Sequence, residues 1–251
     1  MTAFDFNETL DRYMMPQEIL SPLIFDADDK MHENVRQNLL KIVGKIIYLT
    51  ITDIKGLEIE DICLVGSLSG FLYREKSDID IYVTVKNTSC KELTKDKQHL
   101  GIFTSAQTNA LKLRNARFHY QDKLVDVKMS PYLPMYASIY SIKENTWLVK
   151  PNKDEFKHIK KEDVINEYLL KKKIILNQLE DFEKKYTGFE LADKLHFFYL
   201  QTMNQFVTHK NKLSDHIVYK LLGKEGIFNL ISGAAMKAYM INCSFQKDNA
   251  L

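Results

Sequence analysis

Two aspartates, Asp78 and Asp80, stand one residue apart in the apolar stretch SDIDIYVTV. Alternate residues of a strand share a face and lie about 6.6 Å apart along it, so both carboxylates would point the same way. Two charged carboxylates this close repel each other unless a cation lies between them. Proteins commonly bind Mg²⁺ through one or two carboxylates together with the phosphates of a substrate. The pattern therefore indicates a site for Mg²⁺, or for Mn²⁺ in its place.

A third carboxylate, Asp126, lies in the alternating stretch LVDVKM. We expect it to reach the same face from a neighbouring strand and to act as the third catalytic metal ligand. Lys128 follows two residues later, shares that strand face and is expected to contact a phosphate of the nucleotide. A pair of metal ions in such a site can hold an attacking and a leaving oxygen in line.

A turn before the two aspartates supplies the other half of the chemistry. The apolar stretch IEDICLV is followed directly by Gly66 and Ser67. A sharp turn there would present backbone N–H groups together with the Ser67 hydroxyl. If SLSGFLY begins a helix, its positive N-terminal end points at the same place. These parts suit triphosphate oxygens, and together they fit the attack of an acceptor hydroxyl on the α-phosphorus of a nucleotide.

The stretch LVGSLSGFLYREKSDIDIYV, with a carboxylate in a later strand, resembles the signature of the polymerase-β-like nucleotidyltransferase superfamily. The chain is most similar in pattern to nucleotidyltransferases of large tailed phages, whose flanking segments resemble LSPLIFDADDKMHENVRQNLLKIVGKII, IYSIKENTWLVKP and SDHIVYKLLGKEGIFNLI. The resemblance implies that Gly66 and Ser67 contact the nucleotide phosphates. It also implies that Asp78, Asp80 and Asp126 are the metal ligands.

The expected activity is that of a metal-dependent nucleotidyltransferase, which moves a nucleoside monophosphate from an NTP to a hydroxyl and releases pyrophosphate. The acceptor stays open between an RNA end such as that of tRNA, a protein, a second nucleotide and a small molecule. The sequence departs from the phage pattern at Leu68 to Phe71, and at Tyr82, where those relatives often have histidine. These departures leave an alternative, a non-catalytic module that binds a nucleotide or a host protein on the same fold.

Periodicity predicts the elements that must position these residues. The stretch 32–51 has one apolar face at helical spacing, and the alternating stretch 78–85 predicts a strand after the one at 59–65. Residues 90–115 are expected to form a helix with a loop, and 117–130 and 137–151 two hairpins. The fold class is therefore α+β, an α/β nucleotidyltransferase core with a short mixed sheet, followed by an α-helical C-terminal domain.

The period changes from strand to helix after Pro151, which predicts two domains, 1–153 and 154–251. Helices are expected over 158–186, 190–210 and 214–240, the last interval holding one or two, with Ser214 or Asp215 as the N-cap. The first of these helices is dense in lysine. We interpret that as a solvated face, with a basic ridge for an RNA or nucleotide acceptor as the alternative, made by Lys160, Lys161, Lys171, Lys172 and Lys173.

Bulk composition narrows the class of protein only slightly. The chain has 251 residues, a net charge of +2 and three widely spaced cysteines, Cys63, Cys90 and Cys243. We expect reduced thiols in a cytoplasmic protein, in the bacterial host if a phage encodes it. No signal peptide, membrane contact or zinc site is indicated. The nucleotide base and the oligomeric state are left open.

Overall fold

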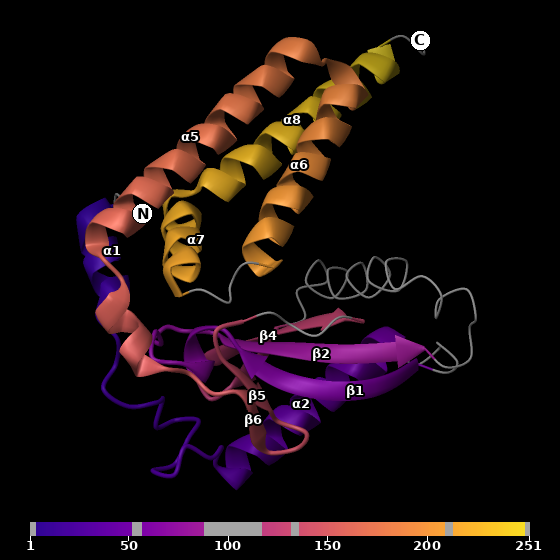
Figure 1. Ribbon diagram of the computed structural model, residues 1–251. Coiled ribbons are helices and arrows are strands. Elements are labelled where there is room, and N and C mark those ends of the chain that lie inside the picture. The colour runs from indigo at the N-terminus through magenta and orange to yellow at the C-terminus, as the bar shows by residue number, and fades with distance from the viewer. Residues whose placement is uncertain (1–3, 52–56, 88–116, 132–135, 209–212, 249–251) are drawn as a thin grey trace. The chain divides into compact units, whose positions relative to one another are not determined.

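The computed structural model describes residues 4–51, 57–87, 117–131, 136–208 and 213–248 (Figure 1). The chain forms two compact units, one of Pro16–Lys153 and one of Met1–Met15 with Asp154–Leu251. The first contains a mixed six-stranded sheet and the second is helical, so the predicted α+β class is confirmed. The helix expected over 90–115 lies outside the described residues.

The sheet has the strand order β3-β4-β2-β1-β5-β6. Strands β2 and β4 pair in parallel, and the other described pairs are antiparallel. The strands are β1 (Leu57–Val65), β2 (Ile79–Asn87), β3 (Phe118–Tyr120), β4 (Lys123–Ser130), β5 (Ile139–Ser141) and β6 (Thr146–Val149). Both predicted hairpins are present, with β3–β4 turning at Gln121–Asp122 and β5–β6 turning at Ile142–Asn145.

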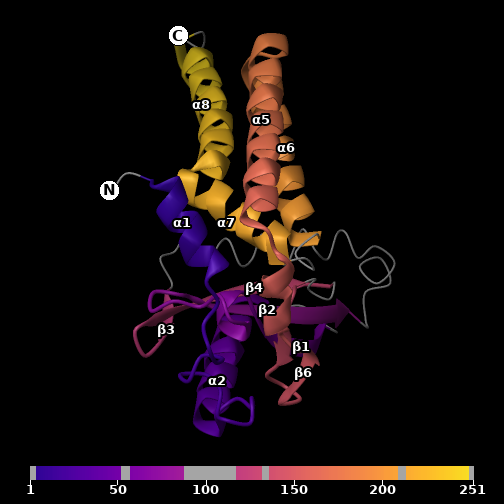
Figure 2. The same cartoon turned by 60° about the vertical axis from the view of Figure 1, so that its left-hand side comes forward.

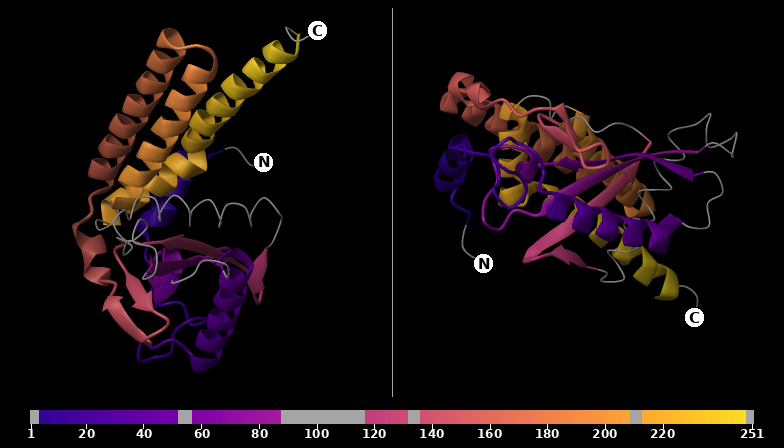
Figure 3. Two further views of the ribbon diagram at one scale, coloured as in Figure 1. Left: turned by 90° about the vertical axis from the view of Figure 1, so that its right-hand side faces the viewer. Right: turned by 90° about the horizontal axis from the view of Figure 1, so that it is seen from below.

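One face of the sheet is covered by helix α2 (Glu33–Ile51), as Figure 3 shows. Its apolar face meets the inward residues of β2 and β4, which alternate with polar ones as predicted. This contact forms the main core, whose buried members include Val35, Leu39, Val43, Ile46, Ile79, Ile81, Val83, Val125 and Val127. Since each such side chain contributes roughly 1.5–3 kcal/mol on burial, the α2 contact fixes which face of β2 carries polar groups.

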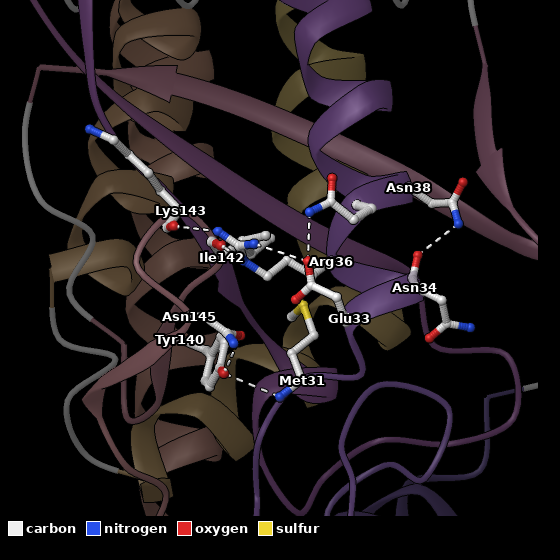
Figure 4. A network of polar contacts seen from close by, with 10 residues as sticks. Met31, Glu33, Asn34, Arg36, Asn38, Tyr140, Ile142, Lys143 and Asn145 are labelled. Carbon is white, nitrogen blue, oxygen red and sulfur yellow. Dashed lines mark hydrogen bonds and ion pairs between the residues drawn. The ribbon is translucent and has the colours of Figure 1, made fainter.

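A network of polar contacts joins α2 and the loop before it to the β5–β6 hairpin (Figure 4). Arg36 donates hydrogen bonds to the carbonyl oxygens of Ile142 and Lys143, each at 2.7 Å. The buried Tyr140 hydroxyl accepts from the Met31 backbone N–H at 3.1 Å and donates to Asn145 Oδ1 at 2.9 Å. The hairpin at the edge of the sheet is thereby held to the helix on its face.

The helical unit contains α5 (Lys161–Lys185), α6 (Gly188–Thr208), α7 (Leu213–Glu225) and α8 (Ile227–Asp248), after a short 3₁₀ helix, η2 (Lys153–His158). Helix α6 packs against α8, and α5 packs against α7 and α6 (Figures 1 and 2). Gly226, at φ +88°, separates α7 from α8 and lets the chain leave one helix for the next.

Helix α1 (Phe6–Met14) is part of this helical unit, although the sequence was expected to place residues 1–15 in the first domain. The reason is packing. Leu10 is fully buried, the Phe6 ring lies 4.6 Å from that of Tyr168 on α5, and Lys161 pairs with Asp11 at 2.5 Å. Asp5 caps the helix by accepting from the Glu8 N–H at 3.0 Å.

Two details of the helical prediction change. Helix α7 begins at Leu213, so Ser214 and Asp215 lie in its first turn and are not N-caps.

Three of the five lysines of the proposed basic ridge are in ion pairs. Lys161 pairs with Asp11, Lys171 with Glu167 and Asp215, and Lys172 with Glu225. These ion pairs join or brace the helices, which disfavours the alternative of a basic ridge for an acceptor. Among the described residues, no helix is long and apolar enough to cross a membrane.

Candidate functional site

The turn that ends β1 opens directly onto the Asp80 carboxylate. Gly66 has φ +79° and ψ −153°, a backbone conformation that is essentially restricted to glycine and costs an L side chain about 1–3 kcal/mol. A Cβ atom there would lie 2.4 Å from Asp80 Oδ2, well inside the contact distance. Glycine is therefore required twice over, for the backbone angle and for the space that the carboxylate occupies. The Gly66 backbone can approach the Asp80 carboxylate this closely only because position 66 has no side chain.

The residues after Gly66 form one turn of 3₁₀ helix, η1 (Ser67–Ser69), and no longer helix follows. The expected contribution of an α-helix N-terminus is therefore wrong, because Gly70 turns into an irregular loop. Ser67 is buried, and its hydroxyl donates to Ser77 Oγ at 3.1 Å, which also accepts from the Arg74 N–H at 2.8 Å. These bonds tie the turn to the approach of β2.

A second pair of serines holds the other side of the turn. The fully buried Ser69 hydroxyl donates to the Gly66 carbonyl oxygen at 2.9 Å and lies 2.8 Å from Ser138 Oγ, next to β5. A Cβ at Gly70 would lie 3.1 Å from that same Ser138 oxygen. The Gly66 turn is thus fixed from both of its flanks.

Asp80 and Asp126 are register partners on the parallel strands β2 and β4. Neighbouring strands lie about 4.8 Å apart, so the two residues stand side by side. Both are partly buried, with 23% of the Asp126 side chain exposed. Lys128 is the register partner of Tyr82, and its Nζ lies 4.0 Å from Asp126 Oδ2. The structure therefore brings Gly66, Asp80, Asp126 and Lys128 into one neighbourhood, on the sheet face opposite α2.

Asp78 is the exception among the predicted ligands. It lies one residue before β2, outside the ladder, and its side chain is exposed. Within the described residues, no group of three or more His, Cys, Asp or Glu side chains is arranged to hold a metal ion. The donors that fit a hard divalent cation are thus the neighbouring carboxylates of Asp80 and Asp126, with oxygen ligands of the kind that Mg²⁺ prefers.

The site continues along β2 and β4, beyond the two carboxylates. Tyr82 packs on a small apolar cluster, and burial raises the pKa of its phenol, while a hydrogen bond with Ser130 and the charge of Lys128 act in the opposite direction. The cluster consists of Cys63, Val65, Tyr136 and Ile139. Thr84 follows on the same face. It is 3% exposed, and its hydroxyl has no hydrogen-bond partner among the described residues.

Four serines form a frame around the turn, and sequence reasoning identified Ser67 but missed Ser69, Ser77 and Ser138. Ser77 and Ser138 contact the turn, yet neither is close to it in sequence, and no local pattern marks them.

The structure explains two of the departures from the phage pattern by packing. Leu68 is fully buried in the main core and Phe71 packs against it, so these two positions are occupied by packing residues.

Chemically, the site combines a backbone turn, two adjacent carboxylates, a lysine and a phenol. Such a set can bind a cation and phosphate oxygens together, because the carboxylates attract the cation while the turn and the lysine provide N–H donors.

The chain matches no protein-family model, and comparisons with curated proteins and with solved structures found no significant match.

Proposed function

We propose that the protein is a metal-dependent nucleotidyltransferase that transfers a nucleoside monophosphate from an NTP to a hydroxyl acceptor. The observation that carries the proposal is the Gly66 turn, which opens onto the Asp80 carboxylate beside its register partner Asp126. The resemblance of this part of the sequence to the polymerase-β-like signature supports the same reaction.

The triphosphate would be bound by the Gly66–Ser67 turn. Backbone N–H groups in a tight turn form a concave surface for anions, and the serine frame holds that surface in place. Preorganised donors of this kind stabilise developing charge without reorganising during the reaction. Asp80 stands next to the turn, so a cation held there would lie beside the phosphates.

Asp80 and Asp126 would hold Mg²⁺ or Mn²⁺, and Asp78 is available as a further ligand because its side chain is exposed. A bound divalent ion supplies charge neutralisation for the triphosphate and for the pyrophosphate that leaves. The protein's part is to keep the two carboxylates in register, and the parallel pairing of β2 with β4 does so.

The reaction would proceed by in-line displacement. The acceptor oxygen attacks the α-phosphorus and forms a new P–O bond, while the bond from that phosphorus to the α–β bridging oxygen breaks. Its electron pair leaves with pyrophosphate. Asp126 accepts the proton of the hydroxyl and passes it to solvent. Asp126 is partly exposed, so a proton can leave by this route.

The test is incubation of the protein with each labelled NTP and Mg²⁺ or Mn²⁺, alongside Asp80→Asn and Asp126→Asn. We expect nucleotide transfer by the wild type and a loss of at least about a hundredfold in each variant, the lower end of what a positioned acid or base contributes. Asp122→Asn is the matched control, since Asp122 lies in the β3–β4 turn of the same hairpin and is exposed.

Binding provides a second readout. Mg²⁺ and NTP should stabilise the wild type by about 2.7 kcal/mol at a hundredfold excess over the dissociation constant, and Asp80→Asn should lose most of that stabilisation. If no NTP binds with either metal by calorimetry, the proposal is wrong.

The alternative function is a non-catalytic module that binds a nucleotide or a protein on the same fold. The observation that favours it is the placement of Asp78 outside the pair, which leaves no three-carboxylate group among the described residues. Tight NTP binding without turnover, across RNA, protein and small-molecule acceptors, would select this alternative. Pyrophosphate release that Asp80→Asn abolishes would exclude it.

A further inference from the structure

The functional groups of the site follow one another along the sheet in a fixed order. The Gly66 turn lies at the end of β1, where Val65 pairs with Asp80. Asp80 and Asp126 form the next level, and Tyr82 with Lys128 the level after it, about 6.6 Å farther along the strands. Lys128 therefore stands on the side of the carboxylate pair that faces away from the turn.

The geometry of in-line displacement indicates which side of the carboxylate pair binds the leaving group and which binds the acceptor. The attacking oxygen and the leaving oxygen lie roughly opposite each other across the phosphorus. If the Gly66 turn binds the end of the triphosphate that leaves as pyrophosphate, the acceptor approaches from the side of Tyr82 and Lys128. These two residues then contact the acceptor and lie away from the leaving group, so Lys128 binds the acceptor in place of the NTP phosphate that the sequence led us to expect.

On the acceptor side, the ammonium group of Lys128 makes only a weak ion pair. Lys128 Nζ is 4.0 Å from Asp126 Oδ2, longer than a direct hydrogen bond, and half of its side chain is exposed. An exposed pair at this distance contributes little to stability. Its three N–H donors can thus turn toward an anion next to the acceptor hydroxyl. Tyr82 supplies an aromatic surface beside it, held by the apolar cluster beneath.

We propose that the acceptor carries a phosphate group on the same sugar as its attacking hydroxyl, and that Lys128 and Tyr82 form the subsite that binds this phosphate. This inference rests on the proposed function and names its acceptor class. A nucleotide and an RNA 3′ end share that chemistry. A neutral polyol has no group for Lys128 to bind, and a cationic aminosugar would be repelled by it.

The experiment measures kcat/KM for four acceptors with saturating NTP and Mg²⁺: AMP, adenosine, a short single-stranded RNA with a 3′ hydroxyl, and a cationic aminosugar. We expect the wild type to prefer AMP over adenosine by about tenfold, the scale of one charge-assisted hydrogen bond. Use of the RNA in preference to AMP, or the reverse, distinguishes the two sources of the phosphate.

Two lysine variants separate the subsite from general charge. Lys128→Met should reduce the preference for AMP over adenosine to about onefold, mainly through the KM for AMP. Lys86→Met is the matched control, because Lys86 lies farther along β2, is equally exposed and is paired with Glu58. It should leave the preference unchanged.

Three results would overturn the inference while leaving the proposed function intact: equal use of AMP and adenosine by the wild type, an equal effect of Lys128→Met on both, or preference for the aminosugar. Absence of NTP binding and turnover would instead remove the proposed function, and the acceptor subsite with it. Charge reversal in Lys128→Glu gives an independent check. It should lower the use of AMP further than Lys128→Met does.

Discussion

At the scale of single residues, the site depends on a contact between a glycine and a carboxylate. Gly66 leaves the space that Asp80 Oδ2 fills, so the two positions are coupled although they are fourteen positions apart in the sequence. Residues that share such a contact give non-additive effects on stability, with interaction energies of about 0.5–3 kcal/mol. The coupling can therefore be measured.

We expect Gly66→Ala to destabilise the protein by about 1–3 kcal/mol, from the strained φ and from the overlap with Asp80. In an Asp80→Ala background the same change should cost less, by about 1 kcal/mol, because the carboxylate is gone while the strain at φ remains. Urea unfolding of the four proteins in this cycle gives the coupling. Additive values would show that the turn moves away from Asp80 without cost.

At the scale of elements, the Tyr140 hydroxyl is one of the groups that tie the β5–β6 hairpin to the α2 region, beside the two hydrogen bonds from Arg36. Tyr140→Phe removes the acceptor of the buried Met31 N–H and the donor to Asn145. Leaving such groups unpaired costs about 1–3 kcal/mol, and we expect a loss of that size in the free energy of unfolding. Chemical denaturation measures it.

The control for this prediction is Tyr48→Phe, at an exposed tyrosine of α2. It should change the free energy of unfolding by less than about 0.5 kcal/mol. Equal effects of the two variants would mean that solvent replaces the Tyr140 partners, and that the hairpin is held by the aromatic contacts of its ring with Phe25 and Trp147.

Elements were predictable from the sequence where the apolar period is long. The period-two pattern of β2 and the helical face of α2 follow from local spacing, and both are confirmed. The parallel register of β2 with β4, which sets Asp80 beside Asp126, was not predictable. Local alternation indicates which face a residue takes and leaves open the partner it meets on another strand.

Helix α1 shows the opposite limit. Nine residues are too few for a stable isolated helix, so its structure depends on partners far along the chain. The Asp5 cap and the apolar Leu10 are visible in the sequence, but they stabilise the helix only when it packs against α5 and α7. The same reason explains why Ser138 of the serine frame was missed, since it contacts Ser69 across a sequence separation of 69 residues.

At the scale of the whole molecule, the helical unit is built from both ends of the chain. Leu10→Ala should destabilise it by about 2–5 kcal/mol, because Leu10 is fully buried. Hydrogen exchange read by mass spectrometry should show lost protection in α7, against which α1 packs, and unchanged protection in β2.

The exposed Met15, in the same unit, provides the control. Met15→Ala should leave exchange in α7 at the wild-type rate. Lost protection in β2 as well as α7 after Leu10→Ala would show that the two units unfold together.

Placing α1 with the last helices has a consequence for synthesis. The ribosome synthesises α1 before Pro16–Lys153 and its partners on α5 and α7 after that segment. At about 5–20 residues per second, the first helix waits roughly 10–50 s before its binding surface exists. During that interval the sheet unit can fold while Phe6 and Leu10 remain exposed to chaperones and proteases. The helical unit can therefore be completed only after α5 and α7 have been synthesised, later than the sheet unit that lies between α1 and these helices in the sequence.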